Sequence, residues 1–175
     1  QQSLEQLAKL KPIFRPGGTV TAGNSCPLTD GATSLVICRE QQLPEFSHAE
    51  PLGFVTGYAI AGCDPRRMGL GPVFAMARLF RETGKQLSDF DLIEINEAFA
   101  AQAIASCRDL GIDWRDQNKF NPIGGAIALG HPIAATLCIL LVKAAYELKL
   151  RNDRYALITA CVGGGQGVAT IIERA

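Results

Sequence analysis

The feature that most constrains the fold is an apolar stretch over residues 133–142, IAATLCILLV. It follows Pro132, a residue that favours the first turn of a helix, and it predicts a helix from Pro132 to about Lys149. The first turns of this helix have no polar face, so they must be covered on all sides. Crossing a bilayer takes about 20 such residues, so we expect burial and not membrane insertion. One sheet with helices on one face cannot enclose this helix, and we expect a second domain to cover part of it.

The overall charge and the cysteines narrow the classes of protein. Seventeen basic residues balance seventeen acidic ones, which gives no electrostatic reason to expect binding to nucleic acid or an anionic membrane. Six scattered cysteines form no CxxC pair, and only two histidines are present, so we expect no metal site. Cysteines within apolar runs indicate a reducing compartment. We expect a cytoplasmic protein, although organelle targeting depends on the true N-terminus.

The pattern of apolar runs and turn residues predicts an α/β fold with a mixed five-stranded sheet and helices on both faces, in the order βαβαβαββ. We expect residues 1–23 to be a lead-in segment and residues 24–175 to form one domain. The strands are expected at residues 32–40, 52–61, 90–95, 155–161 and 167–173, and the helices at 72–83, 97–109 and 132–149.

The first candidate site motif is Asn96-Glu97-Ala98-Phe99, at a junction between a strand and a helix. Open α/β sheets bind ligands at the carboxyl ends of their strands. The simpler interpretation is an asparagine that caps the helix, followed by glutamate in the first turn. Both interpretations remain open on spacing alone.

The second motif, over residues 124–132, is GGAIALGHP. Glycines let a ligand come close to the backbone, and His131 would lie at the start of the apolar helix. A helix N-terminus disfavours a protonated imidazole, so the ring would be neutral and able to accept a proton. Packing in the core and catalysis are both open for His131.

The third motif, over residues 161–167, is CVGGGQG, with four glycines between two strands. A hairpin needs fewer, so we expect backbone N–H groups that face developing negative charge. Cys161 would enter this loop at the end of a strand, although an isolated cysteine is usually an inert core residue. The spacing does not match a phosphate-binding glycine motif.

These three motifs, in this order, resemble the thiolase family. The resemblance extends upstream through GTVTAGN, DGA and MGLGPV and covers essentially the whole chain. It implies a five-layer αβαβα arrangement in which two similar halves pack around buried helices. It also implies that this chain is the C-terminal half only, and that the nucleophilic cysteine belongs to the N-terminal half.

The resemblance also implies roles for individual residues in reactions of coenzyme A thioesters. His131 would activate the nucleophilic cysteine and bind the thioester oxygen, while Asn96 would position a water in the same oxyanion hole. Cys161 would move the proton at the α-carbon, and Gly163 would lend its N–H to a second oxyanion hole. The family implies no metal or redox cofactor.

Substrate binding and packing involve further positions. The resemblance implies that Ser25 and Met68 lie where coenzyme A binds. After the Gly-His-Pro motif the family usually continues xGATGxR, whereas this chain has Leu137 in place of the second glycine and Ile139 in place of the arginine. These departures bear on the packing of the apolar helix and on the acyl pocket.

We therefore expect part of an acyl-CoA C-acyltransferase of lipid and fatty acid metabolism, acting by Claisen condensation or by thiolytic cleavage of 3-ketoacyl-CoA. This chain alone is expected to be inactive. Its partners would be acyl-CoA, coenzyme A and a thiolase N-terminal half, in a homo-oligomer when complete. The alternative is a non-catalytic thiolase-like module that binds acyl-CoA or supports an assembly. Retention of Asn96, His131 and Cys161 together favours the enzyme.

Overall fold

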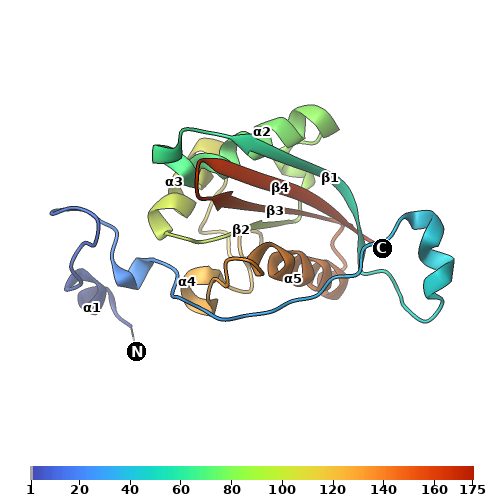
Figure 1. Cartoon of the computed structure of the whole chain (residues 1–175), viewed down its shortest axis with the longest axis horizontal. Helices are drawn as coiled ribbons and strands as arrows, with labels where there is room; N and C mark the ends of the chain where they lie inside the picture. The colour runs from blue at the N-terminus through green and yellow to red at the C-terminus, as the bar shows by residue number, and fades with distance from the viewer. Residues whose placement is uncertain (1) are drawn as a thin grey trace.

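The structure, a computed structural model, describes residues 2–175 and contains one mixed sheet (Figure 1). Its strands are β1 (Gly53–Gly62), β2 (Leu92–Ile95), β3 (Tyr155–Val162) and β4 (Gln166–Arg174). They lie side by side in the order β1-β4-β3-β2. The pairs β1–β4 and β3–β4 are antiparallel, and the pair β2–β3 is parallel. The prediction of an α/β fold with a mixed sheet is confirmed.

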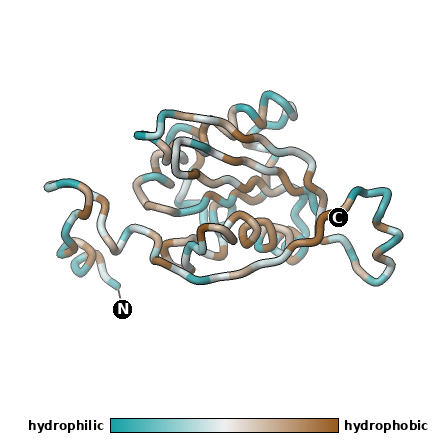
Figure 2. The backbone as a smooth tube through the Cα atoms, viewed as in Figure 1, coloured by the Kyte–Doolittle hydropathy of each residue, from teal (hydrophilic) through white to brown (hydrophobic). Residues whose placement is uncertain are grey.

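Helices cover both faces of this sheet, as predicted. On one face lie α2 (Gly71–Thr83) and α3 (Ala100–Leu110), which build the larger core cluster with Met76, Leu79 and Phe90. On the other face lies α5 (Thr136–Arg151), which packs Leu140, Ala144 and Leu148 against Leu92, Ala156 and Ile158. Figure 2 shows the apolar residues concentrated along α5 and the central strands.

Short elements connect and precede these units. Helices α1 (Leu4–Ala8) and α4 (Ala126–Leu129) are single turns. The 3-10 helices are η1 (Ala22–Asn24), η2 (Glu40–Phe46), η3 (Pro65–Leu70) and η4 (Leu87–Asp89). None of the helices within residues 2–175 is long and apolar enough to cross a membrane. The predicted division at residue 23 stays a prediction.

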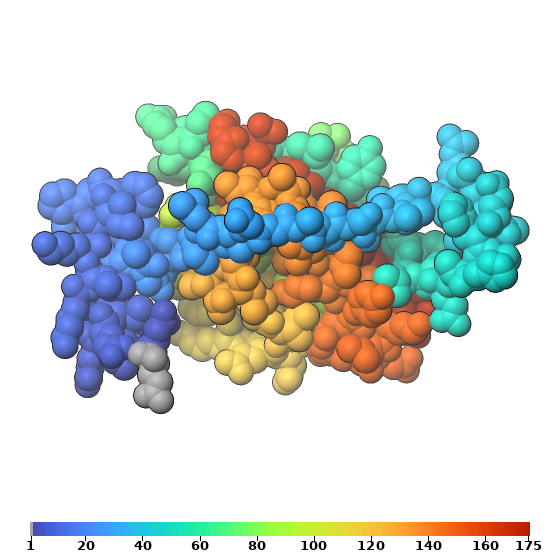
Figure 3. Space-filling view, turned by 60° about the horizontal axis from the view of Figure 1, so that its bottom comes forward, coloured from blue at the N-terminus to red at the C-terminus, as the bar shows by residue number. Residues whose placement is uncertain are grey.

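The prediction of a fifth strand at residues 32–40 is wrong. This stretch belongs to an extended segment, residues 26–39, that pairs with no strand of the described chain. Figure 3 shows the segment as a narrow blue band that crosses the molecule over the orange residues of α5. The side chains of Val36 and Ile37 are 80% and 74% exposed. The apolar composition predicted a buried strand, but nothing within residues 2–175 provides the neighbouring strand or the cover.

The apolar helix begins later than predicted. Residues 132–135 form a turn in which the Pro132 carbonyl accepts hydrogen bonds from the amides of Ala135 and Thr136. Helix α5 then runs to Arg151, and Asn152 ends it in the left-handed conformation. Helix α3 likewise begins at Ala100 and not at Glu97.

Helix α5 is covered on one side only. Residues such as Leu140 and Leu148 are buried against the sheet. The flank formed by Cys138, Ile139 and Val142 is only partly buried, and Ile133 before the helix is 81% exposed. This agrees with the expectation that a further domain covers the helix.

Candidate active site

Two of the three predicted motifs meet at the carboxyl edge of the parallel strands β2 and β3. Asn96 directly follows β2, and its amide donates to the Thr159 carbonyl of β3 at 3.0 Å, so the pairing continues one residue beyond the strand. Cys161 follows Thr159 by two residues near the end of β3. Parallel pairing therefore delivers Asn96 and Cys161 to the same edge, where ligands of α/β sheets bind.

Asn96 is directed at His131. Its side chain is 1% exposed, and its Nδ2 lies 3.4 Å from His131 Nε2. It does not cap helix α3, because the residue in the N-cap position is Phe99. The helix-cap interpretation of Asn96 is therefore wrong, and the structure brings Asn96 and His131 together across 35 residues of sequence.

The hydrogen bonds around His131 favour one tautomer. Its Nδ1 lies 2.7 Å from the hydroxyl oxygen of Thr136, and that hydroxyl donates its own proton to the Pro132 carbonyl at 3.0 Å. The hydroxyl then accepts from the ring, so Nδ1 carries the hydrogen and Nε2 is the unprotonated nitrogen that accepts from Asn96 Nδ2. Burial lowers the pKa of His131. The predicted cause, a helix N-terminus at His131, is wrong, because α5 begins five residues further on.

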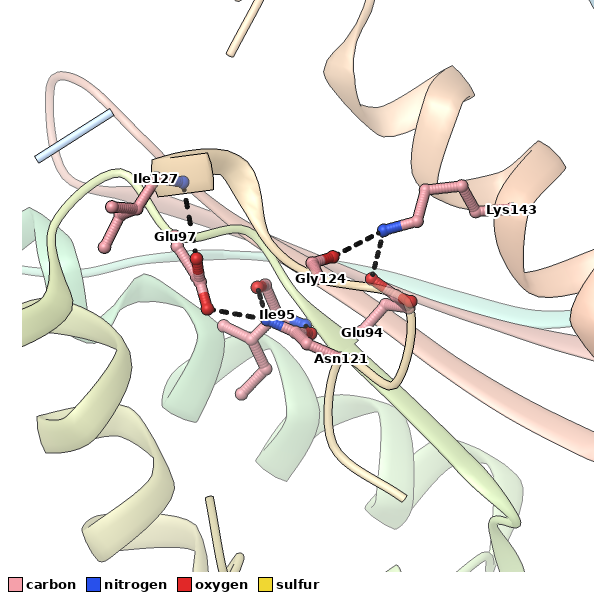
Figure 4. Close-up of polar contacts among 7 residues, drawn as sticks. All are labelled: Glu94, Ile95, Glu97, Asn121, Gly124, Ile127 and Lys143. Atoms are coloured by element: carbon pink, nitrogen blue, oxygen red, sulfur yellow. Dashed lines mark hydrogen bonds and ion pairs between the residues drawn. The ribbon is translucent and has the colours of Figure 1, made fainter. Parts of the chain in front are cut away.

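Polar groups not singled out in the sequence hold the glycine loop that leads to His131 (Figure 4). Lys143 of α5 donates to Glu94 Oε2 at 3.2 Å and to the Gly124 carbonyl at 2.8 Å. On the loop's other side, Glu97 accepts from the Ile127 amide and from Asn121. The signal for Lys143 was present in the sequence, since a lysine within an apolar helix needs a buried partner.

Glu94 is an unusual buried carboxyl. Its side chain is 1% exposed, and its Oε1 accepts no hydrogen bond from the residues that the structure describes. Burial raises the pKa of Glu94 to about 7, against the opposing attraction of Lys143. This carboxyl thus titrates near neutral pH, unlike an ordinary glutamate with a pKa near 4.5.

Cys161 is partly buried, and burial raises the pKa of its thiol. The neighbouring thiols Cys26 and Cys63 raise the same pKa further. Cys161 is therefore protonated at neutral pH. It shares the strand edge with Asn96, but no hydrogen bond joins its thiol to Asn96 or His131 among residues 2–175.

Three of the four glycines after Cys161 are explained by the fold. Gly164 and Gly165 have φ of +87° and +88°, which other residues rarely adopt. A side chain at Gly167 would overlap the backbone of Gly71 at the start of α2. Gly163 has neither restriction, since its φ is not positive and a Cβ there would meet open space. Gly163 is exposed at this turn, and its role as an N–H donor stays a prediction.

The two positions expected to contact coenzyme A lie in different connecting segments. The Ser25 hydroxyl donates to the Thr21 carbonyl at 2.7 Å, so its proton is already used within the chain. Met68 lies in η3. Just before η3, the Cys63 amide donates to the Gly165 carbonyl at 2.7 Å, so η3 lies beside the glycine turn. The roles of Ser25 and Met68 in binding coenzyme A stay predictions.

Comparison with known proteins agrees with this geometry. Residues 49–174 match the family model described as the C-terminal domain of thiolase. The chain belongs to the thiolase family. Residues 1–41 match the model of the thiolase N-terminal domain, so the unpaired segment at residues 26–39 falls entirely within that match. The motif-based resemblance is therefore confirmed.

The related thiolases are longer than this chain. The mitochondrial 3-ketoacyl-CoA thiolase of Bos taurus is 45% identical over 173 residues, covering 99% of this chain and 43% of the relative. The acetyl-CoA acetyltransferase of Chromobacterium violaceum is 45% identical over 172 residues, covering 98% and 43%. The crystal structure of human mitochondrial 3-ketoacyl-CoA thiolase in complex with CoA is 44% identical with a TM-score of 0.94, covering 100% and 43%. This chain thus spans 43% of the length of these relatives.

Proposed function

We propose that this chain is the C-terminal part of a thiolase, an acyl-CoA C-acyltransferase that cleaves 3-ketoacyl-CoA with coenzyme A or runs the reverse Claisen condensation. The observation that carries the proposal is the Asn96–His131 contact at 3.4 Å, which joins the first and second motifs at the unprotonated ring nitrogen Nε2. It is supported by the names of the relatives, which are 3-ketoacyl-CoA thiolases and acetyl-CoA acetyltransferases.

His131 would act first, on a cysteine supplied by the N-terminal part of the enzyme. Its Nε2 takes the thiol proton, and the thiolate attacks the thioester or ketone carbonyl. The imidazolium formed then donates a hydrogen bond from Nε2–H to the carbonyl oxygen as negative charge develops there. Asn96 Oδ1 is buried and has no partner among the described residues, which suits acceptance from a water whose second hydrogen points at the same oxygen.

Cys161 would handle the proton at the α-carbon. In cleavage, the bond between the α- and β-carbons breaks, the electron pair stays on the α-carbon, and the Cys161 thiol gives that carbon its proton. The raised pKa of Cys161 favours this protonated starting form. In condensation the Cys161 thiolate takes the proton back, and the Gly163 N–H stabilises the enolate oxygen.

The remaining properties of the complete protein are proposals of the same kind. We propose a cytoplasmic homo-oligomer in fatty acid metabolism whose substrates are acyl-CoA and coenzyme A, with acid–base groups that need no metal or redox cofactor. The N-terminal domain would cover the partly buried flank of α5 and supply the nucleophile. Leu137 packs beside the core cluster under α5, so this departure from the family pattern is accommodated and does not favour the non-catalytic alternative.

The test uses the complete enzyme, in which this chain is joined to or complexed with a thiolase N-terminal domain. We expect thiolysis of acetoacetyl-CoA, and we expect Cys161→Ala to abolish condensation while acyl transfer to the enzyme continues. Cys138→Ala, at a partly buried cysteine of α5, is the matched control and should keep activity. Full condensation in the Cys161→Ala enzyme would show that another group moves the α-proton.

A further inference from the structure

Glu97 follows Asn96 directly, but its side chain points to a different part of the site. Its Oε2 accepts from the Ile127 amide at 3.3 Å, and its Oε1 accepts from Asn121 Nδ2 at 3.2 Å (Figure 4). Ile127 lies in the first turn of α4, where backbone N–H groups lack partners within the helix. The N-cap residue of α4 is Gly125, which has no side chain to offer, so Glu97 supplies the acceptor from another element.

Asn121 ties the same carboxylate to strand β2. Its Oδ1 accepts from the Ile95 amide at 2.9 Å and its Nδ2 donates to the Ile95 carbonyl at 3.0 Å. Its own amide donates to the Ile93 carbonyl at 2.9 Å. The Asn121 amide group therefore cannot turn over without losing both bonds to Ile95. Glu97 thus connects α4 to a segment that is already fixed on β2.

Gly125 shows that the position of the Glu97 carboxylate is specific. Its φ of −116° and ψ of −178° are extended and open to any residue. A Cβ at this position would nevertheless overlap the carboxylate carbon and both carboxylate oxygens of Glu97. A side chain at residue 125 would thus displace the Glu97 carboxylate, while the backbone conformation itself imposes no restriction.

The position of α4 contributes to where His131 lies, together with Thr29, whose hydroxyl accepts from the His131 amide at 3.1 Å. Helix α4 is four residues long and is followed by Gly130, whose amide donates to the Ala126 carbonyl, and then by His131. A shift at the start of α4 is therefore passed to His131 within one turn, while Asn96 stays on β2. The contact between Asn96 and His131 depends on the register between these two elements.

We propose that Glu97 is a positioning residue of the thiolase reaction, which it serves by fixing α4 to β2 and thereby setting the contact between Asn96 and His131. This inference rests on the proposed function. No hydrogen bond joins the Glu97 side chain to His131 or Cys161 among residues 2–175; it acts through Ile127 and Asn121.

The substitution Glu97→Gln tests the two-acceptor arrangement with little change in volume. A glutamine has one acceptor oxygen, and its NH₂ group would face the Ile127 amide or Asn121 Nδ2, donor against donor. A displacement of the order of 1 Å can cost about 10²-fold in rate. In the complete enzyme we expect kcat for acylation by acetyl-CoA to fall about 10–100-fold, with KM within about 3-fold.

Two further variants serve as an intermediate case and a control for this measurement. Glu97→Asp keeps the charge but shortens the reach, so we expect partial activity between the parent and Glu97→Gln. Glu82→Gln, at an exposed carboxylate on α2 that pairs with Arg78, is the matched control and should match the parent in both kcat and KM. A kcat for Glu97→Gln within about twofold of an active parent overturns the proposal.

A second measurement does not depend on activity. Gly125→Ala should lower the melting temperature of the complete enzyme markedly, but only slightly in a Glu97→Ala background, because the overlap involves the carboxylate. The NMR resonances of the His131 ring should move in Glu97→Gln. Equal losses of melting temperature in both backgrounds, or unchanged His131 resonances, overturn the proposal. Absence of thiolysis in the parent would instead contradict the proposed function, and these two readouts would still decide whether Glu97 positions His131.

Discussion

Glu94→Gln should change how the stability of this domain depends on pH. The folded pKa of Glu94 is about 7, raised by burial from 4.5. The raised pKa means that the folded state binds this proton more tightly than the unfolded chain does. The resulting stabilisation is fully present below pH 4.5 and is lost as the pH rises through 7. Glutamine has nearly the same shape and cannot ionise, so the variant lacks this loss.

The two pKa values give the size of the effect. Between pH 5 and pH 8 the parent should lose about 2.5 kcal/mol of unfolding free energy relative to Glu94→Gln. For a unit of this size this corresponds to about 5–10 °C in melting temperature. The charged groups that face Glu94 are Lys143 and Glu147 of α5 and Glu97 after β2. Other titrating groups, such as His131, are common to both proteins and cancel in the difference.

Thermal unfolding of parent and variant between pH 5 and pH 8 measures this difference directly. If the isolated chain aggregates, hydrogen exchange of the β2 and β3 amides in the complete enzyme reports the same free energy. Glu173→Gln is the control, because that carboxyl lies at the surface of β4 beside Arg154 and its pKa is lowered. Parallel pH profiles for parent and Glu94→Gln would refute the reasoning and show that Lys143 keeps Glu94 ionised throughout.

Three further outcomes are expected. The isolated chain should not catalyse thiolysis of acetoacetyl-CoA, as a spectrophotometric assay would show, and turnover by the pure chain would contradict the missing nucleophile. His131→Ala should slow acylation of the complete enzyme by at least about 10²-fold in stopped-flow. Asn96→Ala should slow it less, because Asn96 acts through a water that can be partly replaced. Equal acylation rates for the two variants would show that His131 is not the general base. Lys143→Met should raise the pKa of Glu94 further, seen as a shift of the stability loss to higher pH, and an unchanged midpoint would exclude Lys143 as its counter-charge.

Periodicity predicted the parts of the fold that depend on local sequence. Strand β1 and the hairpin of β3 and β4 lie within about a residue of their expected bounds, because alternation and glycine turns set them locally. The strand expected at residues 32–40 failed because pairing needs a neighbour, and a single sequence does not say where that neighbour is. The start of α5 was missed because residues 132–135 form a turn around the Pro132 carbonyl.

The candidate site was predictable at the level of motifs and not at the level of contacts. Asn96 and His131 were selected by their glycine and strand surroundings, and the structure places them 3.4 Å apart. Thr136, which favours one His131 tautomer, carries no distinctive signal in the sequence. The same holds for Asn121, whose bonds to Ile95 follow from a chain segment returning to β2 after 26 residues. Such contacts depend on the tertiary path of the chain.

The exposed apolar residues are explained by the part of a thiolase that this chain matches. Residues 1–41 match the thiolase N-terminal domain, and the extended segment within them crosses the molecule over α5 (Figure 3). Val36 and Ile37 of this segment are 80% and 74% exposed, and the flank of α5 is only partly buried. We expect one partner, the remainder of the N-terminal domain, to cover both at once. Adding that domain should raise the melting temperature and create activity together, whereas a stable monomer that binds no dye for apolar surface would show that these residues need no cover.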